Sequence, residues 1–327
     1  MIVPANPENI DRAASLLRAG QLVSFPTETV YGLGADARNR EAVAKVFAAK
    51  QRPIGHPLIV HLADAAALGN WARAIPAGAQ ALADAFWPGP LTLILPRAAA
   101  VPDVVTGGQD SVGLRVPGHP VAHALLERFA ALGGEGVAAP SANRFGRVSA
   151  TTAQHVAEDF GTEVALILDG GACRHGIEST IVAFTGPEPE LLRLGAIGVE
   201  ALARVLGREP RIAGSDAPRA PGTLATHYAP QTRARLLPRD DLLAALAHMG
   251  RSTGHIAVLA HSVAQPALFE GTWFDAPARG HAYAHELYAN LRALDARAAD
   301  EIWIETPPDG PEWSAVRDRL RRATHRG

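Results

Sequence analysis

The sequence predicts a mixed α/β fold in two domains: a twisted sheet flanked by helices, then a smaller Rossmann-like α/β domain. The chain has 327 residues, more than one typical domain requires, and 47% of them are hydrophobic. Apolar runs of strand length alternate with helical patterns, but some expected strands follow one another directly, which favours a mixed sheet over a purely parallel one. The helical and strand patterns both stop near Gly207 and resume further along the chain, which indicates a second domain.

The first domain is expected to span residues 1–207. Asn6 can cap its first helix, Pro7 fits the first turn, and Gly20 ends the helix. Thr151 and Gln154 form a capping-box pattern at the start of a later helix that runs to residue 160. Further helices are expected at 39–50, 65–72, 77–86, 119–131 and up to 206. Strands are expected at 22–25, 58–62, 91–95, 111–116, 136–139, 164–168, 179–184 and 191–194.

Residues 208–233 are rich in proline and show no helical or strand period. The segment is longer than an ordinary connection, so we expect either a linker or a functional loop, and in the second case a lid over an active site. The C-terminal α/β domain is expected to span residues 234–327. Its strands are expected at 234–237, 256–260, 272–275 and 301–305, and its helices at 240–248, 283–298 and from 312 onward.

Charge and cysteine usage narrow the class of protein. The net charge is −2, so no overall basic field attracts nucleic acid or membrane. The single cysteine, Cys173, excludes an internal disulfide and favours a reducing compartment. The N-terminus lacks a secretory pattern, and no apolar stretch is long enough to cross a bilayer. We therefore expect a cytoplasmic protein.

The Gly-Leu-Gly tract that begins at Gly32 follows a strand, but it does not predict a dinucleotide-binding turn. Six residues separate the strand from this glycine, whereas that fingerprint places its first glycine directly at the turn. The sequence predicts instead a rigid loop that begins at Pro26. It would offer the hydroxyls of Thr27 and Thr29 and the backbone amides near Gly32 and Gly34.

Lys50 and Arg52 lie where a helix is expected to end. Cations at this position commonly balance a helix C-terminus. Pro53, however, fixes the chain directly after Arg52, and a Lys–Arg pair in a rigid turn suits a polyphosphate. From these residues alone the two interpretations are equally supported.

Small polar residues follow the expected strand at 136–139, namely Ser141, Asn143 and, further on, Ser149. Such residues beyond the carboxyl end of a strand commonly hold ligands, although plain turn chemistry is the simpler interpretation. Arg115 and Arg193 lie inside apolar strands. If they face inward they need an anion, because an unpaired buried charge is costly.

His61, in an apolar strand, is by default a core histidine. The sequence contains no HExxH motif, no cysteine cluster and no defensible Ser-His-Asp pattern, so it predicts no metal site built by the protein. Arginine, lysine and hydroxyl groups gather at loop edges without an obvious nucleophile. This pattern favours phosphoryl or nucleotidyl transfer by positioning and charge stabilisation.

Several tracts resemble the signature motifs of the YrdC-like family. They are 24–34 (SFPTETVYGLG), 50–53 and 57–61 (KQRP and PLIVH), 87–92 (WPGPLT), 140–143 (PSAN) and 178–181 (ESTI). Pro221-Gly222 and the HYAP run at 227–230 resemble the linker of the long, two-domain members of the family. The motifs cover residues 1–230, and beyond them the resemblance rests on architecture.

The resemblance implies a twisted sheet with a positively lined cavity. Its implied threonine contacts are Thr29, His61, Arg115, Ser179 and the backbone at Ala139. Its implied ATP contacts are Arg52, His56, Ser111, Ser141, Asn143, Ser149, Arg193 and Tyr228, with Lys50 and Arg52 as the catalytic residues. His56 stands where many relatives carry asparagine, so its phosphate contact is expected to be pH-sensitive near neutrality.

The activity implied by the resemblance is that of an L-threonylcarbamoyladenylate synthase, a nucleotidyltransferase. It would join L-threonine, bicarbonate and ATP into threonylcarbamoyl-AMP, releasing pyrophosphate and water, for tRNA threonylcarbamoyladenosine modification. Mg²⁺ would arrive on the ATP phosphates and need little from the chain. A downstream tRNA threonylcarbamoyl transferase complex would take the product.

Three alternatives stay open at this point. The first is an RNA-binding regulatory protein on the same fold. Its best support is the set of arginines in the last helix, expected to form a solvated face: Arg317, Arg319, Arg321 and Arg322. The second, a carbamoyl-adenylate enzyme, would need acylphosphatase and zinc-finger segments that this chain lacks. The third, a paralogue without synthase activity, is disfavoured by the intact Lys-x-Arg and Ser-x-Asn pairs.

Overall fold

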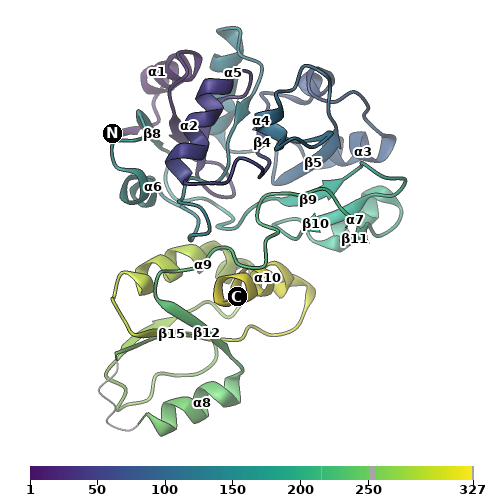
Figure 1. Cartoon of the computed structure of the whole chain (residues 1–327). Helices are drawn as coiled ribbons and strands as arrows, with labels where there is room; N and C mark the ends of the chain where they lie inside the picture. Colours follow the sequence, from purple (N-terminus) through teal and green to yellow (C-terminus); the bar gives the residue numbers. More distant parts are fainter. Residues whose placement is uncertain (215, 250–254, 326–327) are drawn as a thin grey trace. The chain divides into compact units, whose positions relative to one another are not determined.

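The computed structural model describes residues 1–214, 216–249 and 255–325 (Figure 1). The chain divides into two compact units. The first contains Met1–Phe145 and Ser149–Thr223, and the second contains Gly146–Val148 and the chain from Leu224 onward. Each unit has its own sheet, and each is described here by itself.

The first unit is built on an 11-stranded sheet with the order β1-β8-β2-β3-β7-β4-β6-β5-β9-β10-β11. The strands are β1 (Ile2–Pro4), β2 (Val23–Phe25), β3 (Gly32–Asp36), β4 (Ile59–His61), β5 (Leu91–Pro96), β6 (Ser111–Arg115), β7 (Val137–Ala138), β8 (Leu166–Asp169), β9 (Thr180–Ala183), β10 (Glu190–Arg193) and β11 (Arg211–Ile212). Parallel pairs such as β4–β6 adjoin antiparallel pairs such as β5–β6. The predicted mixed sheet is therefore confirmed.

Helices flank this sheet. They are α1 (Pro7–Arg18), α2 (Arg40–Lys50), the 3₁₀ helix η1 (Ala65–Asn70), α3 (Ala77–Phe86), α4 (Asp103–Thr106), α5 (Pro120–Ala131), α6 (Ala153–Phe160) and α7 (Val199–Leu206). Asn6 caps α1 as predicted, since its side chain accepts a hydrogen bond from the amide of Asn9 at 2.9 Å. The predicted cap of α6 was wrong by one residue: Thr152, not Thr151, accepts from the amide of His155. The helix expected at 65–72 is a 3₁₀ helix.

The two faces of the sheet are covered differently. On one face α2, α3, α6 and α7 pack against a single large apolar cluster. On the other face α1 and α5 cover the strands at one end. Over β4, β5 and β9, the strand residues Ile59, Ile94 and Ile181 pack instead against Ala220, which lies far along the chain beyond β11. A segment predicted as linker therefore covers this part of the sheet.

The loop predicted to offer amides near Gly32 and Gly34 was wrong in part, because both glycines lie in strand β3, antiparallel to β2. A Cβ at Gly34 would come within 2.8 Å of the ring of Phe25 and 2.9 Å of Val137. Glycine is therefore required here for close packing between strands, not to approach a ligand. The loop itself ends at Tyr31.

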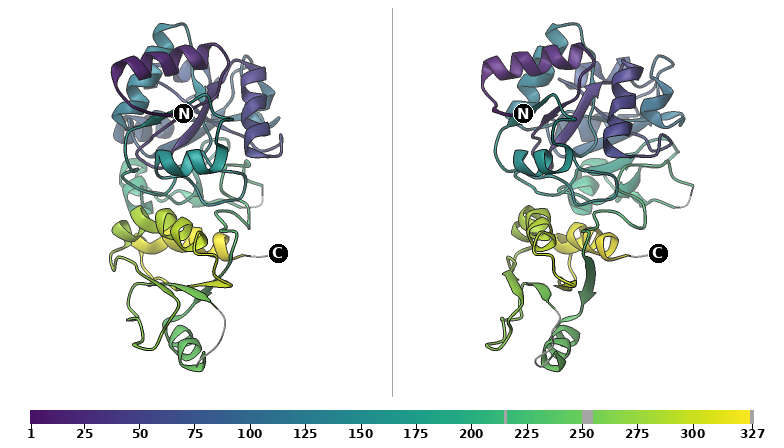
Figure 2. Two further views of the ribbon diagram at one scale, coloured as in Figure 1. Left: turned by 90° about the vertical axis from the view of Figure 1, so that its left-hand side faces the viewer. Right: turned by 60° about the vertical axis from the view of Figure 1, so that its left-hand side comes forward.

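The second unit holds a smaller, parallel sheet in the order β12-β15-β13-β14. Its elements are β12 (Arg233–Leu237), α8 (Arg239–His248), β13 (Ile256–Ala260), β14 (Thr272–Asp275), α9 (Gly280–Asp295), β15 (Glu301–Glu305), the 3₁₀ helix η2 (Pro311–Trp313) and α10 (Ser314–Thr324). Within this unit α8 lies on one side of the sheet, and α9 and α10 lie on the other (Figure 2). The predicted smaller Rossmann-like domain is confirmed.

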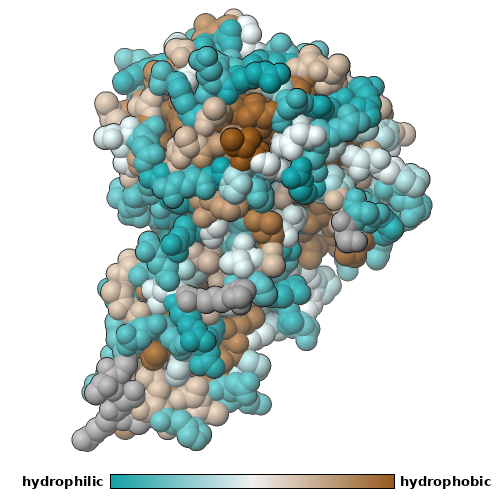
Figure 3. All heavy atoms as spheres, in the orientation of Figure 1, coloured by the Kyte–Doolittle hydropathy of each residue, from teal (hydrophilic) through white to brown (hydrophobic). Residues whose placement is uncertain are grey.

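The surface is mainly polar on the face shown in Figure 3, where the hydrophobic side chains form scattered patches. Most large apolar side chains lie inside the sheet-and-helix layers. Among the described residues, none of the helices combines the length and apolar character needed to span a bilayer.

Candidate functional site

The candidate site begins at the carboxyl ends of two neighbouring parallel strands. His61 ends β4 and Arg115 ends β6, and the two residues are partners in the ladder. Because side chains alternate along a strand, both share the sheet face of Ile59 and Gly113, which lie two residues earlier. This is the face that Ala220 covers. Ligands of open α/β sheets commonly bind beyond such strand ends.

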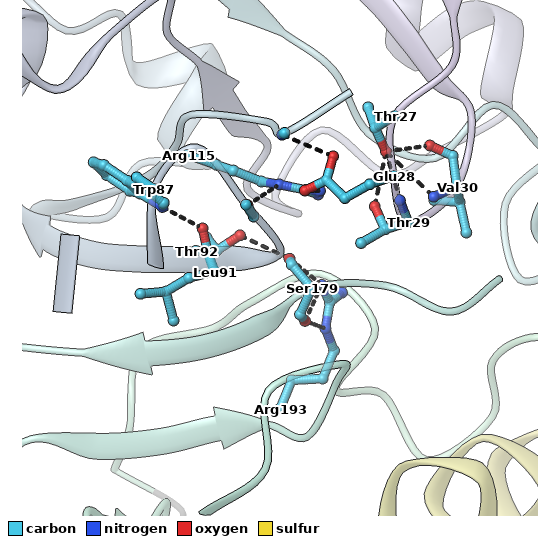
Figure 4. Close-up of polar contacts among 12 residues, drawn as sticks. Thr27, Glu28, Thr29, Val30, Trp87, Leu91, Thr92, Arg115, Ser179 and Arg193 are labelled. Carbon is cyan, nitrogen blue, oxygen red and sulfur yellow. Dashed lines mark hydrogen bonds and ion pairs between the residues drawn. The ribbon is translucent and has the colours of Figure 1, made fainter. Parts of the chain in front are cut away.

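Two hydroxyl residues extend the same face on the next strands. Thr92 lies two residues before Ile94 on β5, and Ser179 lies two residues before Ile181 of β9. Their hydroxyl oxygens are 2.8 Å apart, and both side chains are buried (Figure 4). The predicted threonine contacts His61, Arg115 and Ser179 therefore lie on one face of the sheet.

Arg193 and Ser179 are held together. The guanidinium Nε and Nη2 donate to the carbonyl oxygen of Ser179 at 3.0 and 2.9 Å, and Nη2 also donates to its hydroxyl at 3.0 Å. Nη1 donates to the carbonyl of Pro221 at 2.8 Å. Arg193 thus faces inward, as a binding role requires, and connects the site to the linker segment.

Arg115 also faces inward, and its anionic partner is Glu28. Nη2 donates to Glu28 Oε1 at 2.6 Å, and the two side chains are only 5% and 8% exposed. Arg115 Nε donates to the carbonyl of Gly89, and Glu28 Oε2 accepts from the amide of Gly118. The buried charge that the sequence showed to need an anion is paired within the protein.

The Lys-x-Arg and Ser-x-Asn tracts meet in the folded chain. Lys50 Nζ donates to the carbonyl of Ser141 at 2.6 Å and to that of Asn143. Lys50 is 1% exposed, and burial, with the nearby charge of Arg52, holds its pKa well below the ordinary value. The carbonyl oxygens compensate part of the lost hydration of the ammonium group. Residues about 90 positions apart thus form one cluster.

Arg52 and His56 both lie close to the ring of Phe145. The Arg52 guanidinium carbon is 5.6 Å from the ring centroid of Phe145, and the His56 ring is 5.2 Å from it. Arg52 Nη2 also donates to the carbonyl of Pro57 at 2.9 Å. Burial and the charges of Arg52 and Arg219 lower the pKa of His56, so this imidazole is neutral at pH 7. The expected pH sensitivity is therefore shifted below neutrality.

His61 is neutral as well. Burial, and secondly the charge of Arg115, lower its pKa to about 3. Its Nδ1 is buried without a hydrogen-bond partner among the described residues, and its ring meets that of Phe25 edge-on. A buried polar atom without a partner is costly, which distinguishes His61 from a satisfied core histidine.

The remaining predicted residues lie close by or contribute backbone. The Thr27 and Thr29 hydroxyls are 2.8 Å apart, and the Ser149 hydroxyl donates to Glu178 Oε1 at 2.7 Å. Ser111 is buried at the start of β6. The amide of Ala139 donates to the carbonyl of Ile59, so a ligand contact from this backbone would have to come from its carbonyl oxygen.

Tyr228 belongs to the second unit. It is 1% exposed, and its ring stacks on Tyr288 at 5.6 Å with the guanidinium of Arg319 5.2 Å from its centroid. Its backbone has a φ of 62°, a left-handed conformation uncommon for a residue other than glycine. The contact between Tyr228 and ATP that the resemblance implies stays a prediction.

Four residues of the site were not singled out from the sequence: Glu28, Thr92, Phe145 and Glu178. Glu28, Thr92 and Glu178 lie inside the motif tracts, so the tracts indicated where these residues would be found. The sequence did not predict which side chains these three residues would contact. Phe145 lies just beyond the PSAN tract and had no signal of its own.

No group of three or more His, Cys, Asp or Glu side chains in the described ranges is placed to hold a metal ion. The two buried carboxylates of the site are engaged within the protein, Glu28 with Arg115 and Glu178 with Ser149. Both carboxylates are thus already occupied by neighbouring protein groups.

Comparison with known proteins gives a consistent family. The Sua5–YciO–YrdC family, described as "telomere recombination", matches residues 15–195, and the family described as "threonylcarbamoyl-AMP synthase, C-terminal domain" matches residues 197–324. A threonylcarbamoyl-AMP synthase of Pyrococcus abyssi is 40% identical, with 95% of this chain and 93% of that protein covered. One of Bacillus subtilis is 38% identical, with 97% and 93% covered.

Among solved structures, Sua5 of Pyrococcus abyssi complexed with L-threonine has a TM-score of 0.91 and 37% sequence identity, with 99% of this chain and 97% of that chain covered. The N-terminal unit carries the inward-facing cations and hydroxyls of the predicted site, and both family matches follow one another along the chain. The chain therefore belongs to the Sua5–YciO–YrdC family, in the two-domain form that continues into the threonylcarbamoyl-AMP synthase C-terminal domain.

Proposed function

We propose that this chain is a threonylcarbamoyl-AMP synthase, which joins L-threonine and bicarbonate to the AMP part of ATP. The observation that carries the proposal is the likeness, over nearly the whole of both chains, to the Pyrococcus abyssi protein solved with L-threonine. The geometry supports it, because the Lys-x-Arg and Ser-x-Asn tracts meet at Lys50 and three of the implied threonine residues, His61, Arg115 and Ser179, share one sheet face.

The proposed chemistry needs positioning and charge more than a protein nucleophile. Bicarbonate and the neutral amine of threonine condense by way of CO₂, so that an N–C bond forms, one water leaves with the amine proton, and N-carboxythreonine results. The new carboxylate attacks the α-phosphorus of ATP, and pyrophosphate leaves with the electron pair of the bond that breaks. Both reactants are anions, so the site must offset their repulsion. Lys50, Arg52 and Arg193 would supply this positive charge, and Mg²⁺ bound to ATP would neutralise phosphate oxygens.

The amino acid would bind beside the ends of β4 and β6. There Arg115 would hold its carboxylate, and Thr29, His61 and Ser179 would surround the rest of the molecule. His61 is neutral, so its ring can take part in hydrogen bonds without adding a charge. The ATP would lie toward Arg52, His56, Ser141, Asn143 and Ser149.

We propose further that the segment 219–223 is a strap over the site. Within the first unit, Ala220 packs against the apolar strand residues, and Pro221 accepts from Arg193. The side chain of Gln109 makes two hydrogen bonds to the backbone of Arg219 in the strap. Its Oε1 accepts from the Arg219 amide at 2.7 Å, and its Nε2 donates to the Arg219 carbonyl at 3.0 Å. A strap at this place would keep water from a reactive mixed anhydride.

The product would serve tRNA threonylcarbamoyladenosine modification through a downstream transferase complex, and the enzyme would work in the cytoplasm. The alternative of an RNA-binding protein keeps only part of its support from the arginines of α10. Arg319 is fully buried, Arg322 pairs with Asp318, and Arg317 binds Pro307 and Asp309. Arg321 is exposed, as the expected solvated face requires.

The test measures pyrophosphate release with ATP, Mg²⁺, bicarbonate and each amino acid in turn. Release should require both threonine and bicarbonate. Serine should support only weak release, because a single methyl group in a pocket gives roughly 10–200-fold discrimination. Release at the full rate without threonine would contradict the proposal, and so would tight tRNA binding in a filter assay without any pyrophosphate release.

A further inference from the structure

The charge pair between Glu28 and Arg115 connects three loops at the amino-acid side of the site. Glu28 lies in the loop between β2 and β3, and its carboxylate holds Arg115 through Oε1 and the amide of Gly118 through Oε2. Its backbone carbonyl accepts from the amide of His175 at 2.8 Å. Figure 4 shows the carboxylate and the guanidinium end to end, with Thr92 and Ser179 nearby.

The contacts of Arg115 leave one nitrogen for a ligand. Nε donates to Gly89, and Nη2 donates to Glu28. Nη1 makes no hydrogen bond to any residue that the structure describes. Since a guanidinium is planar and rigid, fixing two of its nitrogens also fixes the direction of the third.

We propose that Glu28 is a positioning residue for the amino-acid carboxylate, because it fixes the Arg115 guanidinium with Nη1 left as the donor to that carboxylate. The proposal rests on the proposed function, since it assumes that Arg115 meets the carboxylate of threonine. It adds a residue whose negative charge would at first sight oppose the binding of an anion.

Glu28 is ionised under working conditions and is therefore a counter-ion, not a proton carrier. Burial raises the pKa of its carboxyl group, but the Arg115 charge and the hydrogen bonds from Arg115 and Gly118 outweigh burial, and the net pKa lies below the ordinary value. A carboxylate that is already ionised and bonded at both oxygens accepts protons poorly at neutral pH.

The experiment measures threonine affinity by calorimetric titration of the full-length protein, and in parallel the KM values for threonine and ATP. Glu28→Gln keeps the size of the side chain but removes its charge, so threonine affinity should fall roughly 10–100-fold. The KM for ATP should stay within about twofold of the parent, because the ATP residues are elsewhere. A purely structural role would change both.

Two further variants make the result specific. Asp36→Asn is the matched control, because Asp36 is also a buried carboxylate that pairs with one arginine, Arg18, and accepts one backbone amide, that of Arg38. It should leave threonine affinity unchanged. In an Arg115→Met background, adding Glu28→Gln should have no further effect on threonine affinity, since Glu28 acts through Arg115. The double variant also removes both charges together, which a fold tolerates better than one unpaired charge.

Unchanged threonine affinity in Glu28→Gln overturns the proposal. Higher threonine affinity overturns it too, because Glu28 would then compete with the ligand for Arg115. Equal losses with and without Arg115, or the same loss in Asp36→Asn, overturn it too. If Glu28→Gln does not fold, the comparison of the double variant with Arg115→Met decides alone. A parent protein that binds threonine but releases no pyrophosphate would contradict the proposed function and leave this test intact.

Discussion

Single residues of the site differ in how their charge is compensated. Lys50 donates hydrogen bonds to two carbonyl oxygens, and Arg115 is paired with a carboxylate. The described contacts of Arg193 are with neutral oxygens. The Arg115 charge is thus balanced by a neighbouring carboxylate, whereas the described contacts of Lys50 and Arg193 are with carbonyl and hydroxyl oxygens. Donor groups held in this way suit a site for two anions.

Arg52 provides the first prediction at this scale. Arg52→Ala should lower turnover roughly 10²–10³-fold, the usual loss when one donor to developing charge is removed. Arg52→Lys should recover only part, because the planar fork is lost. The alanine variant also loses the bond to Pro57, which contributes about 1 kcal/mol to the free energy of unfolding, so turnover should be measured well below its melting temperature. Turnover close to that of the parent would contradict the assignment to phosphate.

His61 provides a second prediction, in the pH dependence of stability. Its folded-state pKa of about 3 lies below the ordinary value of 6.5, so only the unfolded chain takes up this proton as the pH falls below 6.5. The free energy of unfolding should therefore decrease between pH 6.5 and 4.5, by at most about 1.4 kcal/mol per pH unit for this one proton. His56 and His119 add smaller effects of the same sign.

Urea denaturation at pH 6.5, 5.5 and 4.5 measures this slope. His61→Asn should make the slope shallower, whatever it does to the stability itself. His123→Asn is the control, since His123 lies on α5 with a side chain 38% exposed. The same slope in His61→Asn and in the parent would mean that His61 is not held neutral in the folded state.

At the scale of elements, the sequence predicted the longer helices and strands well and the short ones poorly. Periodicity identifies α3 and β15 because each element is long enough for its pattern of apolar residues to repeat. The strands β1 and β11 have three and two residues, too few for a period, and they exist because a neighbouring strand pairs with them. Strand β3 was missed because its two glycines indicate a loop, and the close packing of Phe25 and Val137 that requires Gly34 is seen only in the folded chain.

The sequence also predicted only part of the candidate site. Motifs identified Lys50 and Arg52, and the fold placed them beside Ser141 and Asn143. The role of Glu28 could not be predicted, because its partner lies 87 residues away and the pairing depends on the register of β4 and β6. Sequence patterns report the types of residue a site needs, whereas contacts among them depend on tertiary structure.

The strap carries the prediction at the scale of elements. Gln109→Ala removes both hydrogen bonds to the backbone of Arg219, each contributing about 0.5–1.5 kcal/mol, so opening of the strap should become roughly 5–150-fold more frequent. Hydrogen exchange at the Arg219 amide should speed up accordingly, and threonylcarbamoyl-AMP should be hydrolysed faster on the enzyme. Gln80→Ala, which removes an exposed contact on α3, is the control. An unchanged exchange rate at the Arg219 amide would mean that Gln109 does not hold the strap in place.

At the scale of the whole molecule, the position of the boundary determines which fragments fold. The first compact unit extends to Thr223 and includes β11 and the strap. A fragment 1–223 should therefore melt cooperatively and bind threonine like the full chain. A fragment 1–207 leaves Ile59, Ile94 and Ile181 without Ala220, so it should melt lower and expose apolar surface.

Thermal melting followed by circular dichroism, with threonine calorimetry on both fragments, measures this difference. The full chain at equal concentration is the reference. Equal melting temperatures of the two fragments would show that the strap adds nothing to the fold of the first unit.

The order of strands has a consequence for how the chain folds as it leaves the ribosome. Strand β8 lies between β1 and β2, so Ile2 pairs with Ile167 although they are far apart in sequence. The β2–β3 hairpin can form early, but the edge of β2 that receives β8 stays open until more than half of the chain has been made. During that interval an apolar strand edge is available to other chains. Slow synthesis or truncation before Asp169 should therefore favour aggregation of the nascent chain, because β2 then lacks the strand that covers its edge.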